Sequence, residues 1–210
     1  MRKWFAPALI VVTIIGSAIV YPRLPERVPV HWGLHGQVDR YGSRLEGIAV
    51  MPLLMVACWL LLRFLPRIDP WRLNYEKFRD TYDLFVNSLM ALFVVMQGVL
   101  LATALGHPVA MHRVAPAIVG VLFIILGNAL PRARPNWWFG IRTPWTLSND
   151  RVWMRTHRVG GYLMVGAGIL MLLAAVVASP WTLMVGFAAV LAAGFGSLAY
   201  SYYAWKQESP

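Results

Sequence analysis

Residues 127–158 read GNALPRARPNWWFGIRTPWTLSNDRVWMRTHR and lie between two long apolar runs. We call them the Trp–Arg segment, because they hold six arginines and four tryptophans but a single acid, Asp150. Prolines in the first half each remove a backbone donor and restrain the residue before them, which excludes a continuous helix there. After the last proline, Ser148 is predicted to cap a helix that continues into the next apolar run, and Asp150 suits the positive end of its dipole.

This predicted helix carries two neighbouring stripes of side chains at helical spacing. One stripe consists of Arg151, Arg155 and Arg158, and the other of Trp153, His157 and Gly160. Tryptophan and arginine both suit the boundary between lipid and water, so the segment is predicted to anchor two helices at a membrane interface. It is also a candidate recognition surface, and the two roles do not exclude each other. The candidate partner-binding residues are Asn128, Asn136, Arg142, Thr143, Trp145, Arg151, Trp153, Arg155, His157 and Arg158.

The composition indicates a membrane protein. Apolar residues make up 59% of the 210 residues and charged residues only 13%, whereas a soluble domain carries about 25% charged residues. The net charge of +10 does not indicate a nucleic-acid-binding protein, because the arginines lie in the loops between apolar runs. The single cysteine, Cys58, excludes an internal disulfide.

Six apolar runs predict an all-α, polytopic membrane bundle of about six transmembrane helices. The runs are residues 4–21, 48–65, 84–105, 114–130, 159–178 and 181–203. The first follows a basic start, but no small-x-small cleavage site ends it, so we interpret it as a retained anchor and not as a signal peptide. Three regions are expected: residues 1–65 as an N-terminal helical hairpin with an outer loop at 22–46, residues 66–112 as an inner connection and third span, and residues 113–210 with an inner loop at 131–158.

The distribution of lysine and arginine predicts the orientation. With the N-terminus inside, inner segments hold 14 of the 19 basic residues and outer segments hold 5. The positive-inside rule therefore places both termini and the Trp–Arg segment in the cytoplasm.

The outer loop at 22–46 is rich in proline and glycine and is expected to consist of turns. It is either a loop held by interfacial aromatic residues or a binding element, with the candidate ligand-binding residues His31, Trp32, Gly36, Asp39 and Tyr41. His31 and His35 are weak metal candidates, because the glycines between them make a shared helix face improbable. No metal site, cofactor or catalytic motif is predicted.

Two of the spans have distinctive faces. In the third, Asp83, Asn87 and Gln97 share one face, which is predicted to point into the bundle, with Asp83 either paired to a loop arginine or part of a polar path. In the last, small residues recur every four positions, which predicts close packing inside the bundle or a homodimer face. They are Ala188, Ala192 and Gly196, and beside them Ala189, Ala193 and Ser197.

Two stretches together resemble the SdpI family and the small domain of unknown function that accompanies it. The first stretch has Leu24, Pro25, Pro29, His31, Trp32, Gly36, Asp39 and Tyr41; the second has Gly127, Asn128, Pro131, Pro135, Asn136, residues 139–145, Trp153, residues 156–158 and Gly160. The resemblance covers residues 5 to 203, with both motifs in the family's order.

This resemblance implies a multi-pass protein of the bacterial plasma membrane that gives immunity to, or senses, a secreted antimicrobial peptide. It also implies sequestration of a cytoplasmic repressor in some members. We therefore expect a non-enzymatic protein in contact with membrane lipid, with a peptide toxin as outer partner and a repressor as inner partner, and no direct contact with nucleic acid. The alternative is a small transporter or export component that uses the face of Asp83, Asn87 and Gln97.

Overall fold

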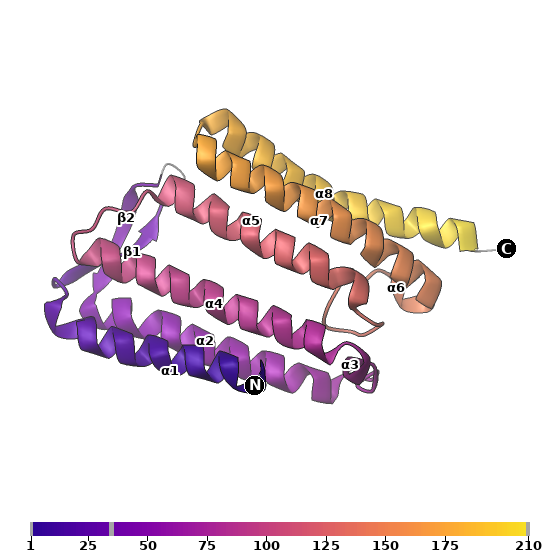
Figure 1. Cartoon of the computed structure of the whole chain (residues 1–210), viewed down its shortest axis with the longest axis horizontal. Helices are drawn as coiled ribbons and strands as arrows, with labels where there is room; N and C mark the ends of the chain where they lie inside the picture. The colour runs from indigo at the N-terminus through magenta and orange to yellow at the C-terminus, as the bar shows by residue number, and fades with distance from the viewer. Residues whose placement is uncertain (1, 34–35, 209–210) are drawn as a thin grey trace. The chain divides into compact units, whose positions relative to one another are not determined.

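Six helices of the computed structural model are long and apolar enough to cross a membrane, which confirms the predicted all-α polytopic bundle. The structure describes residues 2–33 and 36–208. The spanning helices are α1 (Arg2–Val20), α2 (Arg44–Ile68), α4 (Arg79–Ala104), α5 (Met111–Ala129), α7 (Asp150–Val177) and α8 (Pro180–Glu208) (Figure 1). Short helical turns lie at η1 (Tyr21–Arg23), α3 (Asn74–Lys77), η2 (Leu130–Arg132) and α6 (Pro144–Ser148).

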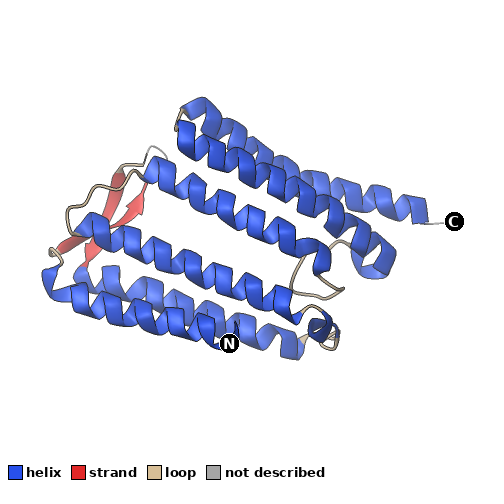
Figure 2. Cartoon of the chain, in the orientation of Figure 1, coloured by secondary structure: helices blue, strands red, loops and turns tan. Residues whose placement is uncertain are grey.

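One element is not helical. Residues expected to form turns instead form an antiparallel hairpin of β1 (Arg27–Trp32) and β2 (Val38–Ser43) (Figure 2). The register shifts on both sides of His31, so the hairpin is irregular. Short strands with bulges and prolines carry little periodic signal, which is why the sequence indicates only turns here.

The second span is longer than its apolar run. It was expected at residues 48–65, but α2 has 25 residues, from Arg44 to Ile68. Its first turn contains Glu46 and its last contains Arg67. Hydropathy alone does not indicate the first and last turns of this helix, because charged side chains lie in both of them.

The chain forms two compact units that interleave along the sequence. Unit 1 comprises Met1–Leu62 and Val86–Ala115. Its core contains the buried side chains of Ala6, Ile10, Met55 and Met90, from α1, α2 and α4. The hairpin is fixed to this unit because Val28 is fully buried and packs directly on Gly47 of α2.

Unit 2 comprises Arg63–Phe85 and Pro116–Pro210 and contains the Trp–Arg segment. In it, α5 and α7 approach backbone to backbone at two glycine pairs, Gly120 with Gly168 and Gly127 with Gly161. A Cβ atom added at Gly127 would lie 2.6 Å from the carbonyl oxygen of Gly161, and the reverse substitution would give the same distance. Absence of a side chain at these positions permits the contact.

Helices α7 and α8 form an antiparallel pair joined by a tight turn. Ala178 ends α7 in the left-handed conformation with φ 56°. Ser179 then exchanges hydrogen bonds with Thr182 in the first turn of α8. Small residues of α8 are buried against its neighbours, including Gly186, Ala193, Ser197, Ser201 and Ala204.

Candidate functional site

A buried carboxylate holds the Trp–Arg segment from outside that segment. Asp69, between α2 and α3, is 3% exposed. Its Oδ1 accepts a hydrogen bond from the amide of Trp71 at 2.7 Å. Its Oδ2 accepts from the Tyr75 hydroxyl at 3.0 Å and from the amide of Trp137 at 2.9 Å. Burial, and then the charge of Asp69, raise the pKa of Tyr75 well above its usual value, so its hydroxyl remains a donor.

Asn136 folds the segment around its own side chain. The residue is fully buried. Its Oδ1 accepts hydrogen bonds from the amides of Trp138 and Phe139 at 2.9 and 2.6 Å, and it lies 3.1 Å from the Tyr75 hydroxyl, whose single hydrogen it shares with Asp69. Its Nδ2 donates to the carbonyl oxygens of Arg134 and Phe139 at 2.8 and 2.9 Å. Because both ends of this amide have partners, Asn136 sets the loop conformation and does not face a partner protein.

Phe139 inserts into an aromatic cluster at the start of α4. Its ring centroid lies 5.2 Å from that of Phe85 and 6.1 Å from those of Phe78 and Tyr82. The ring is buried, so the loop has an apolar anchor beside its polar network. The sequence does not predict this cluster, because Phe78, Tyr82 and Phe85 lie far from Phe139 along the chain.

His157 fixes the second half of the loop. Its Nδ1 lies 2.8 Å from the carbonyl oxygen of Trp153, which accepts only, so we assign the proton to Nδ1. Nε2 then accepts the amide hydrogen of Ile141 at 3.0 Å. The rings of His157 and Trp153 stack with their centroids 3.9 Å apart. The indole nitrogen of Trp153 donates a hydrogen bond to the carbonyl oxygen of Ala133 at 2.9 Å. Gly140, with φ 113°, lies so close to the imidazole that a Cβ atom there would collide with it.

A threonine pair closes the segment onto α8. Thr143 caps α6, and it exchanges hydrogen bonds with Thr146 in a capping box. Its hydroxyl also lies 3.1 Å from that of Ser201. All three side chains are buried, so Thr143 holds the loop and does not present a surface.

The cap of α7 differs from the prediction. Ser148 is the last residue of α6, and Asn149 caps α7 instead. The Oδ1 of Asn149 accepts from the amides of Arg151 and Val152 at 2.8 and 3.2 Å. The expected Ser148 cap is therefore wrong by one residue, because the short helix α6 precedes α7.

The two predicted stripes of α7 point in different directions. Trp153, His157 and Gly160 are buried. Arg155 and Arg151 both reach Glu208 at the end of α8, with nitrogen–oxygen distances of 3.2 and 3.5 Å. Arg155 also donates to the side chain of Gln207 at 2.5 Å. A partner that binds these arginines would have to displace Glu208, whereas Arg158 is exposed and forms no ion pair with any residue that the structure describes.

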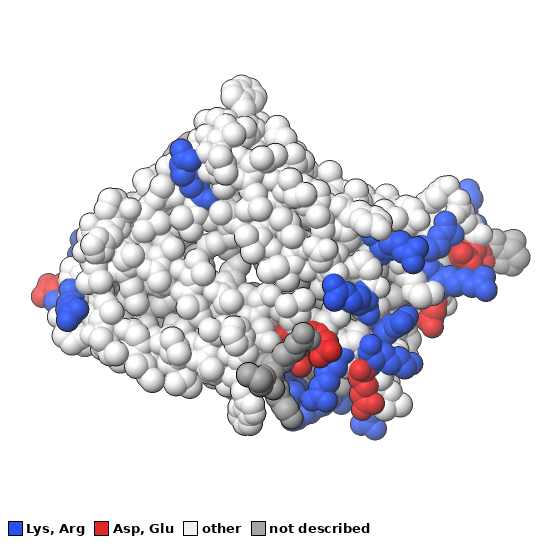
Figure 3. All heavy atoms as spheres, viewed as in Figure 1, with Lys and Arg blue, Asp and Glu red and all other residues white. Residues whose placement is uncertain are grey.

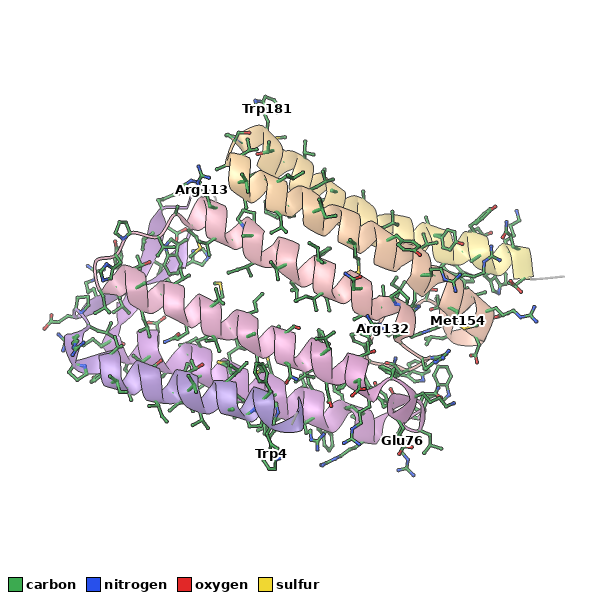
Figure 4. The ribbon with its side chains drawn as sticks, in the orientation of Figure 1. Trp4, Glu76, Arg113, Arg132, Met154 and Trp181 are labelled. Carbon is green, nitrogen blue, oxygen red and sulfur yellow. The ribbon has the colours of Figure 1, made fainter. Side chains whose placement is uncertain are left out.

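Other candidate residues at this end have mixed surroundings. Trp145 packs edge-on against Tyr202 of α8 at 5.1 Å. Asn128 is exposed, and its side chain donates to the carbonyl oxygen of Ile124. Arg142 is exposed and donates to the carbonyl oxygen of Trp137 at 2.7 Å. Figure 3 shows lysine and arginine gathered at the end of unit 2 that holds α3 and α6. Figure 4 places Glu76, Arg132 and Met154 at that same end.

The hairpin brings together four of its five candidate residues at its surface. His31 Nδ1 lies 2.6 Å from Asp39 Oδ1, and both side chains are exposed. Tyr41 is exposed and lies under the guanidinium of Arg27, 5.7 Å from the ring centroid. Trp32 is half-buried, opposite Val38.

Gly36, the fifth, takes a positive φ of 79° beside the backbone of His112. His35 lies outside the described residues. Within residues 2–33 and 36–208 no group of three metal-binding side chains occurs.

The polar face of α4 joins helices in unit 1. Gln97 Nε2 donates to the Ser17 hydroxyl of α1 and to the carbonyl oxygen of Gly47 in α2, both at 3.0 Å. Asp83 and Asn87 are half-buried on the same helix. Among the ion pairs of the described residues none involves Asp83, so the predicted pairing of Asp83 with a loop arginine stays a prediction.

In the last span, the two stripes of small residues separate. Ala193 and Ser197 are buried, whereas Ala188 and Ala192 are exposed. The stripe with Ala193 and Ser197 therefore packs inside the protein, and the stripe with Ala188 and Ala192 remains an exposed candidate for a homodimer face.

Comparisons with known proteins match both halves of the chain. The model of the SdpI/YfhL protein family matches residues 132–201, and that of a domain of unknown function, DUF1648, matches residues 8–56. The chain is 26% identical over 208 residues to the immunity protein SdpI of Bacillus subtilis (strain 168), which covers 99% of this chain and 98% of that protein. No solved structure matches.

Both motifs predicted from the sequence thus fall within matched regions, and the alignment runs through the six spans as well. The resemblance to the SdpI family inferred from the residues is confirmed, and the chain is a multi-pass membrane protein.

Proposed function

We propose that this chain is a non-enzymatic immunity protein of the bacterial plasma membrane, which protects its host against a secreted antimicrobial peptide. The observation that carries the proposal is the similarity to the Bacillus subtilis immunity protein along 99% of the chain. The matched length includes the hairpin, the Trp–Arg segment and the spans. We assign no catalytic residue.

The hairpin is the element we propose to meet the peptide. Its exposed side chains combine an acid–imidazole pair, His31 with Asp39, and an aromatic ring, Tyr41. These groups suit an amphipathic peptide, which offers both charged and apolar contacts. Because Val28 is buried against Gly47, the hairpin is held on α2, and little ordering cost remains for a ligand to overcome.

We propose that the Trp–Arg segment and both termini face the cytoplasm. The distribution of basic residues supports this orientation. The contact of Asp69 with Trp137 also fits it, because the two connections that these residues occupy are separated by two spans and must lie on one side.

An acidic regulator is the proposed cytoplasmic partner. The surface for it is the exposed part of α7, with Arg151, Arg155 and Arg158. Glu208 now neutralises the first two of these arginines. A regulator would have to offer carboxylates in the same geometry, which the bidentate fork of arginine favours.

The transport alternative receives less support. A path would need polar groups of α4 that are free to contact a substrate. Gln97 instead uses both of its donor hydrogens to join α1 and α2. Loss of flux in liposomes on Asp83→Asn would support the transport alternative.

The test is expression of the full chain in a host that is sensitive to the peptide toxin against which SdpI-type proteins protect. We expect survival at a toxin dose that kills the host with an empty vector, and reduced survival for the paired variant His31→Ala with Asp39→Ala. The variant Gln37→Ala, an exposed position between the strands, is the matched control. Equal killing of cells that contain the wild-type protein in the membrane would overturn the proposal.

A further inference from the structure

Three tryptophans at one end of unit 2 form a surface that the internal contacts do not use. The rings of Trp71 and Trp137 lie 6.0 Å apart. Trp137 and Trp138 remain 46% and 42% exposed, although their backbone amides donate hydrogen bonds to buried side chains. We call Trp71, Trp137 and Trp138 the indole platform. Its exposure is notable because the adjoining Asn136 and Phe139 are buried.

The platform is rigid. The amide of Trp137 is bound to Asp69, and that of Trp138 to Asn136. The side chain of Asn74 donates to the carbonyl oxygen of Pro135 at 2.8 Å. These bonds hold residues 71–74 beside residues 135–138, so a ligand would not have to order the loop.

Arginines flank the platform without a carboxylate partner. Arg72 follows Trp71 in the chain, Arg134 precedes Pro135, and Arg142 donates to the carbonyl oxygen of Trp137. The ion pairs found among the described residues involve none of these three arginines. Asp69, which binds the amides of Trp71 and Trp137, is buried and already accepts three hydrogen bonds. The surface around the platform therefore has an excess of positive charge.

We propose that the indole platform and its flanking arginines bind the headgroup of an anionic phospholipid. The guanidinium groups of Arg72 and Arg134 hold the phosphate and any further headgroup anion, and the indoles lie against the glycerol and the first acyl carbons. A lipid fits better than an acidic protein, because the platform adjoins the ends of α2 and α5 and is bordered by the exposed side chain of Leu73. Tryptophan prefers this depth of a bilayer.

The proposal goes beyond immunity, since it concerns which lipids surround the protein and not which peptide it meets. Failure of one would leave the other intact.

The test uses tryptophan fluorescence of the full chain in lipid nanodiscs. Bromine on the upper acyl chain quenches nearby indoles. We compare brominated phosphatidylglycerol with brominated phosphatidylcholine, each at the same mole fraction in a phosphatidylcholine host. We expect stronger quenching by the anionic lipid, and the excess should be reduced in the double variant Trp137→Phe with Trp138→Phe, which removes two of the three indoles of the platform.

Arginine variants test the charge. Arg72→Gln and Arg134→Gln should each reduce the selectivity for the anionic lipid about fivefold. High salt should reduce it in the wild type without any substitution, which covers the case of a variant that fails to fold. The matched control is Arg23→Gln, an exposed arginine at the end of η1, which should leave the selectivity unchanged. Equal quenching by the two lipids in the wild type would overturn the proposal and favour an acidic protein as the occupant.

Discussion

The backbone amide of Trp137 donates a hydrogen bond of 2.9 Å to the carboxylate of Asp69, which lies 68 residues earlier in the chain. This bond ties the connection between α2 and α4 to the connection between α5 and α7. It gives an isolated acid a role that its position in the sequence does not reveal.

Replacement of Asp69 by alanine should destabilise the protein. The change leaves the amides of Trp71 and Trp137 without their acceptor, whereas the Tyr75 hydroxyl keeps Asn136 Oδ1 at 3.1 Å. We expect a loss of about 3 kcal/mol, because each buried donor left unpaired costs about 1–3 kcal/mol. Thermal unfolding in detergent measures it. Glu76→Ala, at an exposed acid of α3, is the control, and an equal melting temperature for Asp69→Ala and wild type would contradict the network.

Replacement of His157 by alanine should loosen the loop at its other end. It removes the acceptor of the Ile141 amide and the ring that stacks on Trp153. The expected cost is about 3 kcal/mol or more, from a cavity and an unpaired donor. Hydrogen exchange at Ile141 should accelerate, whereas His107→Ala, at an exposed histidine, should leave that exchange rate unchanged. Persistent protection of Ile141 in the His157 variant would rule out this contact.

Gly127→Ala should separate α5 from α7. The new methyl group would lie 2.6 Å from the carbonyl oxygen of Gly161 and 2.8 Å from the side chain of Val165. Forced overpacking of this kind costs about 1–3 kcal/mol. Gly166→Ala is the control in the same helix pair, because nothing lies within 4 Å of that position. The idea fails if both variants unfold at the same temperature.

The proposed orientation predicts the accessibility of two single cysteines. In a Cys58→Ser background, a cysteine at Gln37 in the hairpin should react with an impermeant maleimide added to intact cells. A cysteine at Glu76 should react only after lysis. Labelling of both in intact cells would remove the basis for a protein that presents different surfaces on the two sides of the membrane.

The contact of Glu208 with α7 predicts how a regulator would respond. Glu208→Gln should increase the recovery of an acidic cytoplasmic partner in pull-downs, because Arg151 and Arg155 lose their internal carboxylate. Arg155→Ala should decrease it. Lys206→Ala, a change of charge on the same turn of α8, serves as control. Identical recovery of the partner with all variants would indicate that these arginines only anchor α8.

The sequence predicts the parts of this structure that depend on helical periodicity. Spans, the two stripes of α7 and the inward face of Gln97 all follow from spacing along one helix. The bonds between distant segments do not, since nothing in the sequence near Asp69 or Phe78 indicates Asn136 or Phe139 as a neighbour. The sequence also does not predict the hairpin. Val28 and Val30 alternate with other residues, but this alternation is too short to outweigh the prolines and glycines around it.

The paired glycines of α5 and α7 restrict how the Trp–Arg segment can change shape. Two backbone contacts one above the other, at Gly120 with Gly168 and at Gly127 with Gly161, prevent these helices from spreading or turning independently. The Trp–Arg segment connects α5 to α7, so these contacts fix the distance between its two ends. A movement of α5 and α7 can displace this segment as a rigid unit. To open the segment, its own hydrogen bonds must break.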